Sequence, residues 1–346
     1  RLVQVQNLPR NYLDSLDLAR DLVKQQRVDD LKWIYGTVPD TLSQLIRTAF
    51  VPAAGKVFVV ADFSAIEARV IAWLAGETWR QEVFATHGKI YEASASSMFG
   101  VPIDRIKKGN PEYALRQKGK IAELALGYQG SKGALITMGA LDMGLTEEEL
   151  PDIVSRWRQA NKRIVDLWYK FDSAAIEAVA TGHSVLCDNG VTFSCEYDRT
   201  SGLSFLTILL PSGRRLYYAS PKLTKNQWGG DSISYRGTDQ KTKKWGTLET
   251  YGGKLVENVV QAIARDCLAV AMTRLEAAGW RTVMHIHDEC VIETSDWDNS
   301  PVACENGFDN EDALKEACAV MGQPIDWAPG LILRADGFVT RYYKKD

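Results

Sequence analysis

The sequence is poor in the features that mark disulfide-stapled, membrane-spanning or polybasic proteins. It has six cysteines in 346 residues, none of them in a C-x-x-C pair, and it has no apolar run of about 18 residues. Its 41 basic and 44 acidic residues nearly cancel, to a formal net charge of −3. These absences argue against a disulfide framework, a zinc site, a transmembrane helix and anion binding by bulk charge alone.

The chain also lacks an initiator methionine and the charged and apolar regions of a signal peptide. We therefore expect it to begin partway through a longer polypeptide. The irregular spacing of the cysteines favours free thiols in a reducing compartment, which indicates a cytoplasmic protein.

The sequence does contain ample apolar surface and strong local charge. With 45% hydrophobic and 25% charged residues, it is typical of a globular protein of about two to three domains. Residues 104–120 hold six basic against two acidic residues, residues 213–245 hold eight against two, and residues 296–316 hold seven acidic against one basic. The basic patches would suffice for nucleic-acid binding, although each patch is also compatible with a solvated surface.

Hydrophobic periodicity and breaker residues outline the elements that hold the candidate site. Residues 56–61 (KVFVVA) form a buried-strand pattern, and Ser64 with Glu67 has the S-x-x-E form of a capping box that opens a helix to about residue 74. Further helices are expected over 113–126, 152–181 and 255–278, short strands over 185–218, and a β-hairpin over 281–293 with acidic residues at its tip.

Two carboxylates stand where strands end. Asp62 follows the first strand and Asp288 lies at the tip of the hairpin, so they converge if the two strands are neighbours in one sheet. Hard oxygen ligands on rigid strands suit Mg²⁺, and a pair of such ions activates an attacking oxygen and stabilises a leaving one. Taken singly, each aspartate is also explained as an ordinary turn residue.

A second candidate set recurs every four residues along the helix expected over 113–126 and just beyond it. Arg116, Lys120, Leu124 and Tyr128 follow one slowly rotating stripe. The two cations suit neighbouring phosphates and the tyrosine suits a base, whereas a basic face lying over a core stripe is the structural alternative.

Together these segments resemble the sequence motifs of the family A (polymerase I-type) DNA polymerases. Asp62-Phe-Ser-Ala-Ile-Glu-Ala-Arg69 resembles motif A, D-[YF]-S-x-I-E-x-R. Arg116-x3-Lys120-x7-Tyr128 resembles motif B, and His287-Asp288-Glu289 matches the H-D-E of motif C. Further resemblances, in the same order along the chain, are Arg1 with Gln6-Asn7-Leu8-Pro9, and Gln261.

The resemblance implies an α+β fold with the right-hand polymerase architecture, an antiparallel palm sheet and helical fingers, with the thumb absent. Residues 1–74 and 183–346 would form the palm, and residues 75–182 the fingers. Residues 9–47 and 65–73 resemble the phage branch. The chain is expected to be a fragment of a longer replicative polymerase, without proofreading and with a weak grip on duplex DNA.

The implied chemistry is template-directed addition of deoxynucleotides to a primer 3′ end by two-metal nucleotidyl transfer. Asp62 and Asp288 would bind two Mg²⁺ with help from the Phe63 carbonyl. His287 and Glu289 would support the primer terminus and the metal site.

The resemblance gives the helix residues roles in nucleotide binding. Arg116 and Lys120 would hold the triphosphate, and Lys120 would also assist the departure of pyrophosphate. Glu67 would exclude ribonucleotides by crowding the sugar 2′ position, and Tyr128 would stack near the templating base. Leu124 departs from the aromatic residue of the family, which predicts discrimination against dideoxynucleotides.

Arg1 and Gln261 would contact the duplex minor groove. The implied partners are primer–template DNA, deoxynucleoside triphosphates and accessory replication proteins. A monomer without membrane contact is expected, in the infected host cell if the source is viral. A second departure from the family, the extra residue Gln129 after Tyr128, predicts a different end to the motif B helix.

Three rival functions remain open on the sequence. A related single-subunit RNA polymerase or reverse transcriptase is disfavoured by Glu67. A two-metal nuclease would not need the stripe of Arg116, Lys120 and Tyr128. A non-catalytic DNA-binding module derived from a polymerase would keep the fold without needing Asp288.

Overall fold

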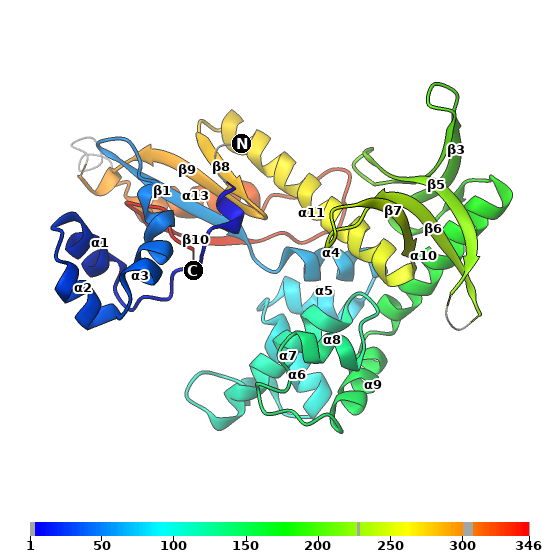
Figure 1. Cartoon of the computed structure of the whole chain (residues 1–346), viewed down its shortest axis with the longest axis horizontal. Helices are drawn as coiled ribbons and strands as arrows, with labels where there is room; N and C mark the ends of the chain where they lie inside the picture. The colour runs from blue at the N-terminus through cyan, green and yellow to red at the C-terminus, as the bar shows by residue number, and fades with distance from the viewer. Residues whose placement is uncertain (1–3, 227–228, 300–306, 346) are drawn as a thin grey trace. The chain divides into compact units, whose positions relative to one another are not determined.

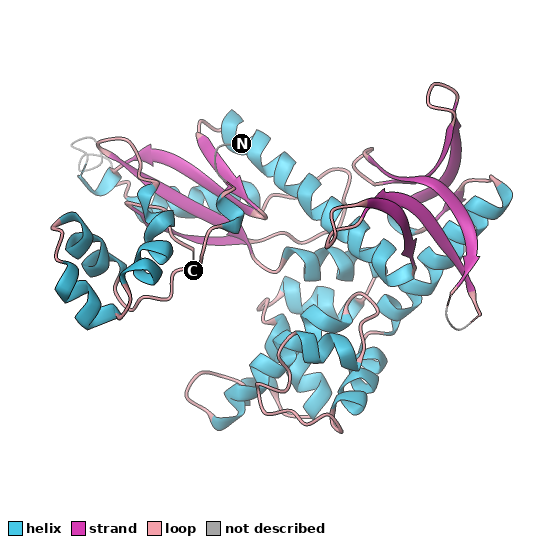
Figure 2. Cartoon of the chain, in the orientation of Figure 1, coloured by secondary structure: helices cyan, strands magenta, loops and turns pink. Residues whose placement is uncertain are grey.

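The computed structural model describes residues 4–226, 229–299 and 307–345, so the expected DNA contact Arg1 lies outside the described residues. Contacts divide the chain into two compact units. The first unit comprises Arg1–Ser64, Cys267–Gln323 and Leu333–Asp346, and the second comprises Ala65–Asp266 and Pro324–Ile332. Each unit combines helices with an antiparallel sheet, which confirms the expected α+β class (Figures 1 and 2).

The two units do not coincide with the ranges expected for palm and fingers. Residues 183–266 group with the helices that precede them, because the second sheet packs on helix α10 (Lys162–Thr181). The assignment of palm and fingers stays a prediction.

A four-stranded sheet in the order β10-β1-β9-β8 forms the centre of the first unit (Figure 1). Strand β1 (Lys56–Phe63) is buried along nearly its whole length, because strands flank it on both sides and helix α13 (Asn310–Met321) packs on it. The remaining strands are β8 (Thr282–Ile286), β9 (Glu289–Ser295) and β10 (Ala335–Thr340), and the preceding helices are α1 (Leu16–Lys24), α2 (Val28–Tyr35) and α3 (Val38–Leu45).

One face of this sheet carries an apolar row that ends in a carboxylate. Phe58 and Val60 pack with Val291 and Tyr343 in a buried cluster. Since side chains alternate along a strand, Asp62 follows Phe58 and Val60 on the same face.

The second unit begins with helices, of which α4, α7 and the pair α9 and α10 lie where the sequence predicts helices, whereas α5, α6 and α8 were not predicted. Helix α4 ends at Gly76, whose φ of 66° gives a left-handed cap. The helical region expected over 152–181 is present as two helices that meet at Asn161. The helices are α4 (Ile66–Ala75), α5 (Thr78–Ala85), α6 (Ile90–Phe99), α7 (Ala114–Leu126), α8 (Lys132–Thr137), α9 (Leu150–Ala160) and α10.

A six-stranded antiparallel sheet in the order β2-β3-β4-β5-β6-β7 follows α10 (Figure 2). The strands expected over 185–218 are present, but the sheet continues to Thr250, through polar stretches that do not alternate cleanly. The strands are β2 (Val185–Leu186), β3 (Thr192–Asp198), β4 (Leu203–Leu209), β5 (Arg215–Lys225), β6 (Asp231–Thr238) and β7 (Trp245–Thr250).

Helix α11 (Gly252–Ala277) confirms the long helix expected before the hairpin, and the boundary between the two units falls within it. None of the helices in the described part of the chain has the length and apolar character that a membrane crossing requires.

The expected capping box at Ser64 is wrong. Helix α4 begins after Ala65, whose φ of 52° is left-handed, and no side chain caps it. The Ser64 hydroxyl instead donates to Oδ2 of Asp336 on β10, at 2.5 Å. The tertiary contact with β10 therefore replaces the local cap, and Glu67 has a different partner.

Candidate active site

The two candidate aspartates come from neighbouring strands, as the sequence predicts. Strand β1 pairs with β9, and Asp62 lies opposite Glu289. Asp288 belongs to the two-residue turn between β8 and β9, and its carbonyl accepts a hydrogen bond from the Phe63 amide at 3.3 Å. The hairpin turn is thereby fixed against the end of β1.

The carboxyl of Asp62 sits among like charges. Burial, and after it the charges of Asp288 and Glu289, raise its pKa to about 7, although Lys345 opposes the rise. Its Oδ1 is buried without a hydrogen-bond partner. Repulsion and an unsatisfied oxygen together make this a place where a cation would be stabilised.

The donor set fits Mg²⁺ better than a metal that needs three or four protein ligands. In the described residues, no cluster of three or more His, Cys, Asp or Glu side chains is arranged to hold a metal. Magnesium is bound through one or two carboxylates, with substrate phosphates and waters completing its shell. The pair Asp62 and Asp288 meets that requirement.

Glu289 is hydrogen-bonded to a tyrosine that no pattern in the sequence indicates. Glu289 is buried, and its Oε1 accepts a hydrogen bond of 2.8 Å from the Tyr343 hydroxyl. Burial raises the pKa of Glu289, while the Tyr343 hydrogen bond opposes that rise. Because 54 positions separate the two residues, no local pattern points to Tyr343.

His287 and Phe63 are the remaining candidate site residues of the first unit. His287 is exposed in the turn and has a left-handed φ of 55°. That conformation is uncommon outside glycine and is often retained at functional sites. The ring of Phe63 is buried, so only its backbone is suited to the ligand role that the family resemblance implies.

In the second unit, the cations of α7 are organised by helix α6. Arg116 Nε donates to Glu92 Oε1 at 2.8 Å, and its guanidinium lies 5.4 Å from the centre of the Tyr91 ring. Lys120 Nζ lies 6.0 Å from the same ring. The helices approach closely at Gly119, where a Cβ would come within 2.2 Å of the Tyr91 carbonyl oxygen. Tyr91 and Glu92 were not predicted from the sequence.

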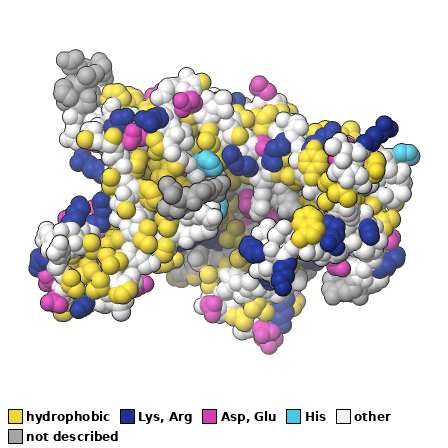
Figure 3. Space-filling view, turned by 45° about the horizontal axis from the view of Figure 1, so that its top comes forward, with side chains coloured by type: hydrophobic (Ala, Val, Ile, Leu, Met, Phe, Trp, Pro, Cys, Tyr) yellow, Lys and Arg dark blue, Asp and Glu magenta, His cyan; other side chains and the backbone are white. Residues whose placement is uncertain are grey.

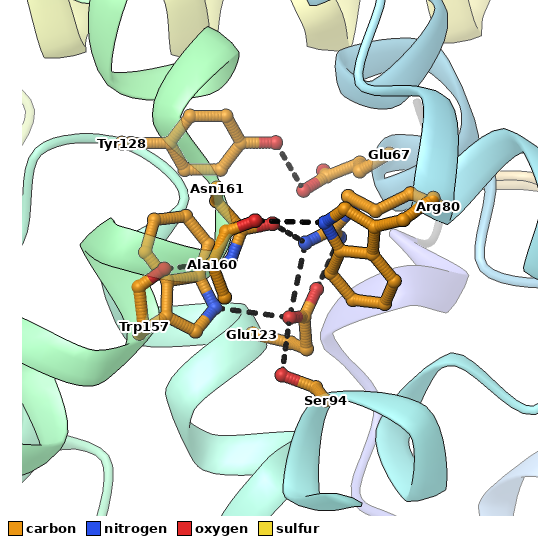
Figure 4. A network of polar contacts seen from close by, with 9 residues as sticks. Glu67, Arg80, Ser94, Glu123, Tyr128, Trp157, Ala160 and Asn161 are labelled. Atoms are coloured by element: carbon orange, nitrogen blue, oxygen red, sulfur yellow. Dashed lines mark hydrogen bonds and ion pairs between the residues drawn. The ribbon is translucent and has the colours of Figure 1, made fainter. Parts of the chain in front are cut away.

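Tyr128 and Glu67 are brought together from separate elements. The Tyr128 hydroxyl donates to Glu67 Oε2 at 3.0 Å (Figure 4). Burial raises the pKa of Tyr128 well above its usual value, and Glu67 adds to the rise. Glu257 of α11 is a further acid near this pair, since burial and then Glu67 raise its pKa.

Glu123, which precedes Leu124 on α7, belongs to a buried network (Figure 4). Its carboxylate forms an ion pair with Arg80 of α5, and it accepts hydrogen bonds from Ser94 Oγ at 2.8 Å and Trp157 Nε1 at 3.0 Å. Arg80 also donates to Asn161 Oδ1 at 2.9 Å. The network ties α7 to α5, α6 and α9, and leaves Leu124 exposed on the outer face.

The extra residue Gln129 lies just beyond the end of α7, and a difference from the helix end of the family stays a prediction. Gln129 adopts a left-handed φ of 65°, and its side-chain oxygen accepts a hydrogen bond from the Gly253 amide at 2.9 Å. A Cβ on Gly253 would lie 2.4 Å from the Tyr128 carbonyl oxygen. The end of α7 is therefore packed on the start of α11, on which Gln261 is exposed.

Comparisons with known proteins show which proteins the chain is similar to. A sequence model of DNA polymerase family A matches residues 34–177. The chain is 57% identical over 347 residues to the DNA polymerase of Bacillus phage SP02, covering 100% of this chain and 50% of that relative. It is 24% identical over 257 residues to the thermostable DNA polymerase I of Thermus aquaticus, covering 73% of this chain and 24% of that relative.

The fold is similar to that of the POL domain of Pol1 from M. smegmatis, solved in complex with DNA primer-template and dNTP. The TM-score is 0.54 at 22% identity, over 87% of this chain and 42% of that chain. The chain thus spans half or less of the length of each of these relatives. On its sequence, the chain belongs to family A of the DNA polymerases.

Proposed function

We propose that this chain carries the catalytic centre of a DNA-directed DNA polymerase, which adds deoxynucleotides to a primer 3′ end on a DNA template. The observation that carries the proposal is the convergence of Asp62 and Asp288 from neighbouring strands. Relatives named as DNA polymerases support the same activity. The four-stranded sheet would be the palm, and helices within residues 75–182 would be the fingers.

Asp62 and Asp288 would hold two Mg²⁺, with the Phe63 carbonyl as a further ligand. When bound, such ions promote ionisation of the attacking hydroxyl and neutralise charge on the transferring phosphate. The protein's part is to fix the two carboxylates on the end of β1 and on the adjoining turn. His287 and Glu289 would support the primer terminus and the shape of this site.

Arg116 and Lys120 would bind the triphosphate. Arg116 would exchange its carboxylate partner Glu92 for phosphate oxygens, which form the same charge-assisted hydrogen bonds. As the primer 3′-oxygen bonds to the α-phosphorus, the bond between that phosphorus and the bridging oxygen to the β-phosphate breaks. Lys120 would protonate or neutralise the departing pyrophosphate.

Glu67, held by the Tyr128 hydroxyl, would occupy the space beside the sugar 2′ position. Tyr128 would also stack near the templating base. Gln261, exposed on α11, would contact the duplex minor groove, as would Arg1.

The decisive experiment is single-nucleotide primer extension with Mg²⁺, comparing the chain with Asp62→Asn and Asp288→Asn. We expect extension by the unaltered chain, its loss in both variants, and preference for dNTPs over NTPs. Magnesium-dependent degradation of the primer in the absence of dNTPs would indicate a nuclease. DNA binding without extension by the unaltered chain, with the same binding in both variants, would indicate a non-catalytic module.

A further inference from the structure

The two faces of the six-stranded sheet differ in character. Side chains that alternate along β3 to β5 give one buried face, on which Phe193 contacts Phe171 of α10 with ring centroids 5.1 Å apart. The opposite face, which we call the outer face, is formed by the intervening residues and is not packed on α10. Figure 3 shows hydrophobic and basic side chains next to one another over this part of the second unit.

Aromatic rings are exposed on the outer face. Tyr217 of β5 is 62% exposed and meets Phe205 of β4 edge to face, with ring centroids 6.1 Å apart. Trp245 of β7 is also 62% exposed. Large aromatic side chains are usually buried, and exposed rings on a sheet are the platforms on which single-stranded nucleic-acid bases stack.

Cations are interleaved with these rings. The strand register places Phe205, Ala219, Arg236 and Thr247 in one cross-strand row, and Arg236 is exposed with the neutral Thr247 hydroxyl as a partner at 3.3 Å. The turn that joins β6 to β7 adds three exposed lysines, which are Lys241, Lys243 and Lys244.

The strand register places three acids on the same face. Glu196 pairs with Arg215, with Oε1 and Nη1 2.5 Å apart, Asp198 accepts hydrogen bonds from the amides of Thr200 and Ser201, and Glu249 is the third. Over β3 to β7, residues 192–250 hold nine basic against five acidic residues, an excess of four positive charges. That excess complements a polyanion rather than an apolar protein surface.

We propose that the outer face of this sheet binds single-stranded DNA, in the form of the unpaired template strand. Bases stack on Tyr217, Phe205 and Trp245, and phosphates contact Arg236 and the lysines of the β6–β7 turn. Unpaired bases fit this face better than duplex does, because a duplex conceals the faces of its bases. That the bound strand is the template rests on the proposed function. The sheet itself lies outside residues 34–177, the segment that the family model matches.

The test measures binding of fluorescein-labelled (dT)20 and of a 20-base-pair duplex by anisotropy. The variant is Tyr217→Ala/Arg236→Gln/Trp245→Ala, and the matched control is Tyr197→Ala, which removes a tyrosine that is 65% exposed on the opposite face of β3. We expect the triple variant to bind (dT)20 at least about tenfold more weakly and the control to stay within about twofold. The salt dependence of binding should also be shallower in the triple variant.

A conservative variant guards against misfolding. Tyr217→Phe/Trp245→Phe keeps both rings and should retain (dT)20 binding within about threefold, whereas loss of binding there would overturn the stacking proposal. Equal weakening of (dT)20 and duplex binding in the triple variant would also overturn it, because charge alone would then account for both. Unchanged (dT)20 binding in the triple variant would overturn it outright.

Primer extension separates this proposal from the proposed function. On a template with a two-nucleotide overhang the triple variant should extend as well as the unaltered chain, and on a 20-nucleotide overhang it should extend less efficiently at low DNA concentration. A chain that binds (dT)20 through these residues but extends no primer would contradict only the proposed function. A chain that extends primers with no dependence on overhang or on these residues would contradict only this proposal.

Discussion

Asp62 in the first unit and Glu123 in the second are carboxylates withdrawn from solvent, with opposite surroundings. Asp62 has two acids near it and one buried oxygen without a hydrogen-bond partner. Glu123 is paired with Arg80 and accepts two further hydrogen bonds. A fully paired carboxylate stabilises the packing of helices and is unavailable for chemistry, whereas an unsatisfied one stores repulsion that a bound cation relieves.

The largest expected effect is on catalysis at the unsatisfied carboxylate. Asp62→Asn should lower single-nucleotide incorporation by at least about 10³-fold, because an amide binds Mg²⁺ far more weakly than a carboxylate. The matched control is Glu293→Gln on β9, since that carboxylate is bound by the Ala53 amide and by Lys56. The incorporation rate of the control should stay within about twofold of that of the unaltered chain. Substantial activity in Asp62→Asn would contradict the contrast drawn between Asp62 and Glu123.

The paired carboxylate should matter for stability instead. Glu123→Ala leaves the buried guanidinium of Arg80 without its carboxylate partner, which should lower the free energy of unfolding by about 3–5 kcal/mol in urea denaturation. The double variant Arg80→Met/Glu123→Leu should lose less than the single variant, because neither charge is left unpaired. A double variant as unstable as the single one would show that packing, not pairing, explains the loss.

Without metal, Asp62→Asn should be more stable than the unaltered chain, whereas Glu123→Ala should be less stable. The gain in the free energy of unfolding should be smaller than that loss. The folded pKa of Asp62 is about 7 against an ordinary 3.8, so between these values only the unfolded chain ionises and stability falls as pH rises. Above pH 7 the variant should be more stable by about 1–2 kcal/mol, and the gain should shrink toward pH 4. Thermal unfolding in EDTA measures it.

The control Glu293→Gln should behave in the opposite way. The Ala53 amide hydrogen bond, with Lys56, lowers the pKa of Glu293, so its contribution is present above its ordinary pKa and is lost as the pH falls. Glu293→Gln should therefore destabilise the chain at pH 8. An increase in stability there would contradict the contrast between paired and unpaired acids.

The smallest expected effect concerns Leu124, an exposed side chain without charge. Leu124→Tyr should raise the incorporation of dideoxynucleotides relative to deoxynucleotides by about tenfold, since it adds a hydroxyl that can replace the missing 3′-hydroxyl. Leu124→Phe adds the ring without the hydroxyl and should leave the ratio near that of the unaltered chain. Equal use of both nucleotide types by the unaltered chain would contradict the expectation.

Much of the site could be predicted because its parts are local patterns. The β-branched run before Asp62 predicts β1, the polar tip of residues 281–293 predicts the turn at Asp288, and both are present. The helix boundaries of α7 follow from its flanking proline and glycine residues in the same way. The capping box failed because Ser64 binds Asp336, far away in the sequence, in preference to its own helix.

The sequence by itself determined the elements and the side chains that they carry, because hydrophobic period and turn residues act over a few positions. Only the tertiary structure decided which carboxylate is satisfied. Arg80 lies 43 positions from Glu123, and Tyr343 lies 54 from Glu289, so neither partnership has a local signature. Repulsion at Asp62 likewise arises only when β9 and its turn are placed beside β1. Pairing and burial depend on contacts between distant segments, and it is these that separate a structural acid from a candidate metal ligand.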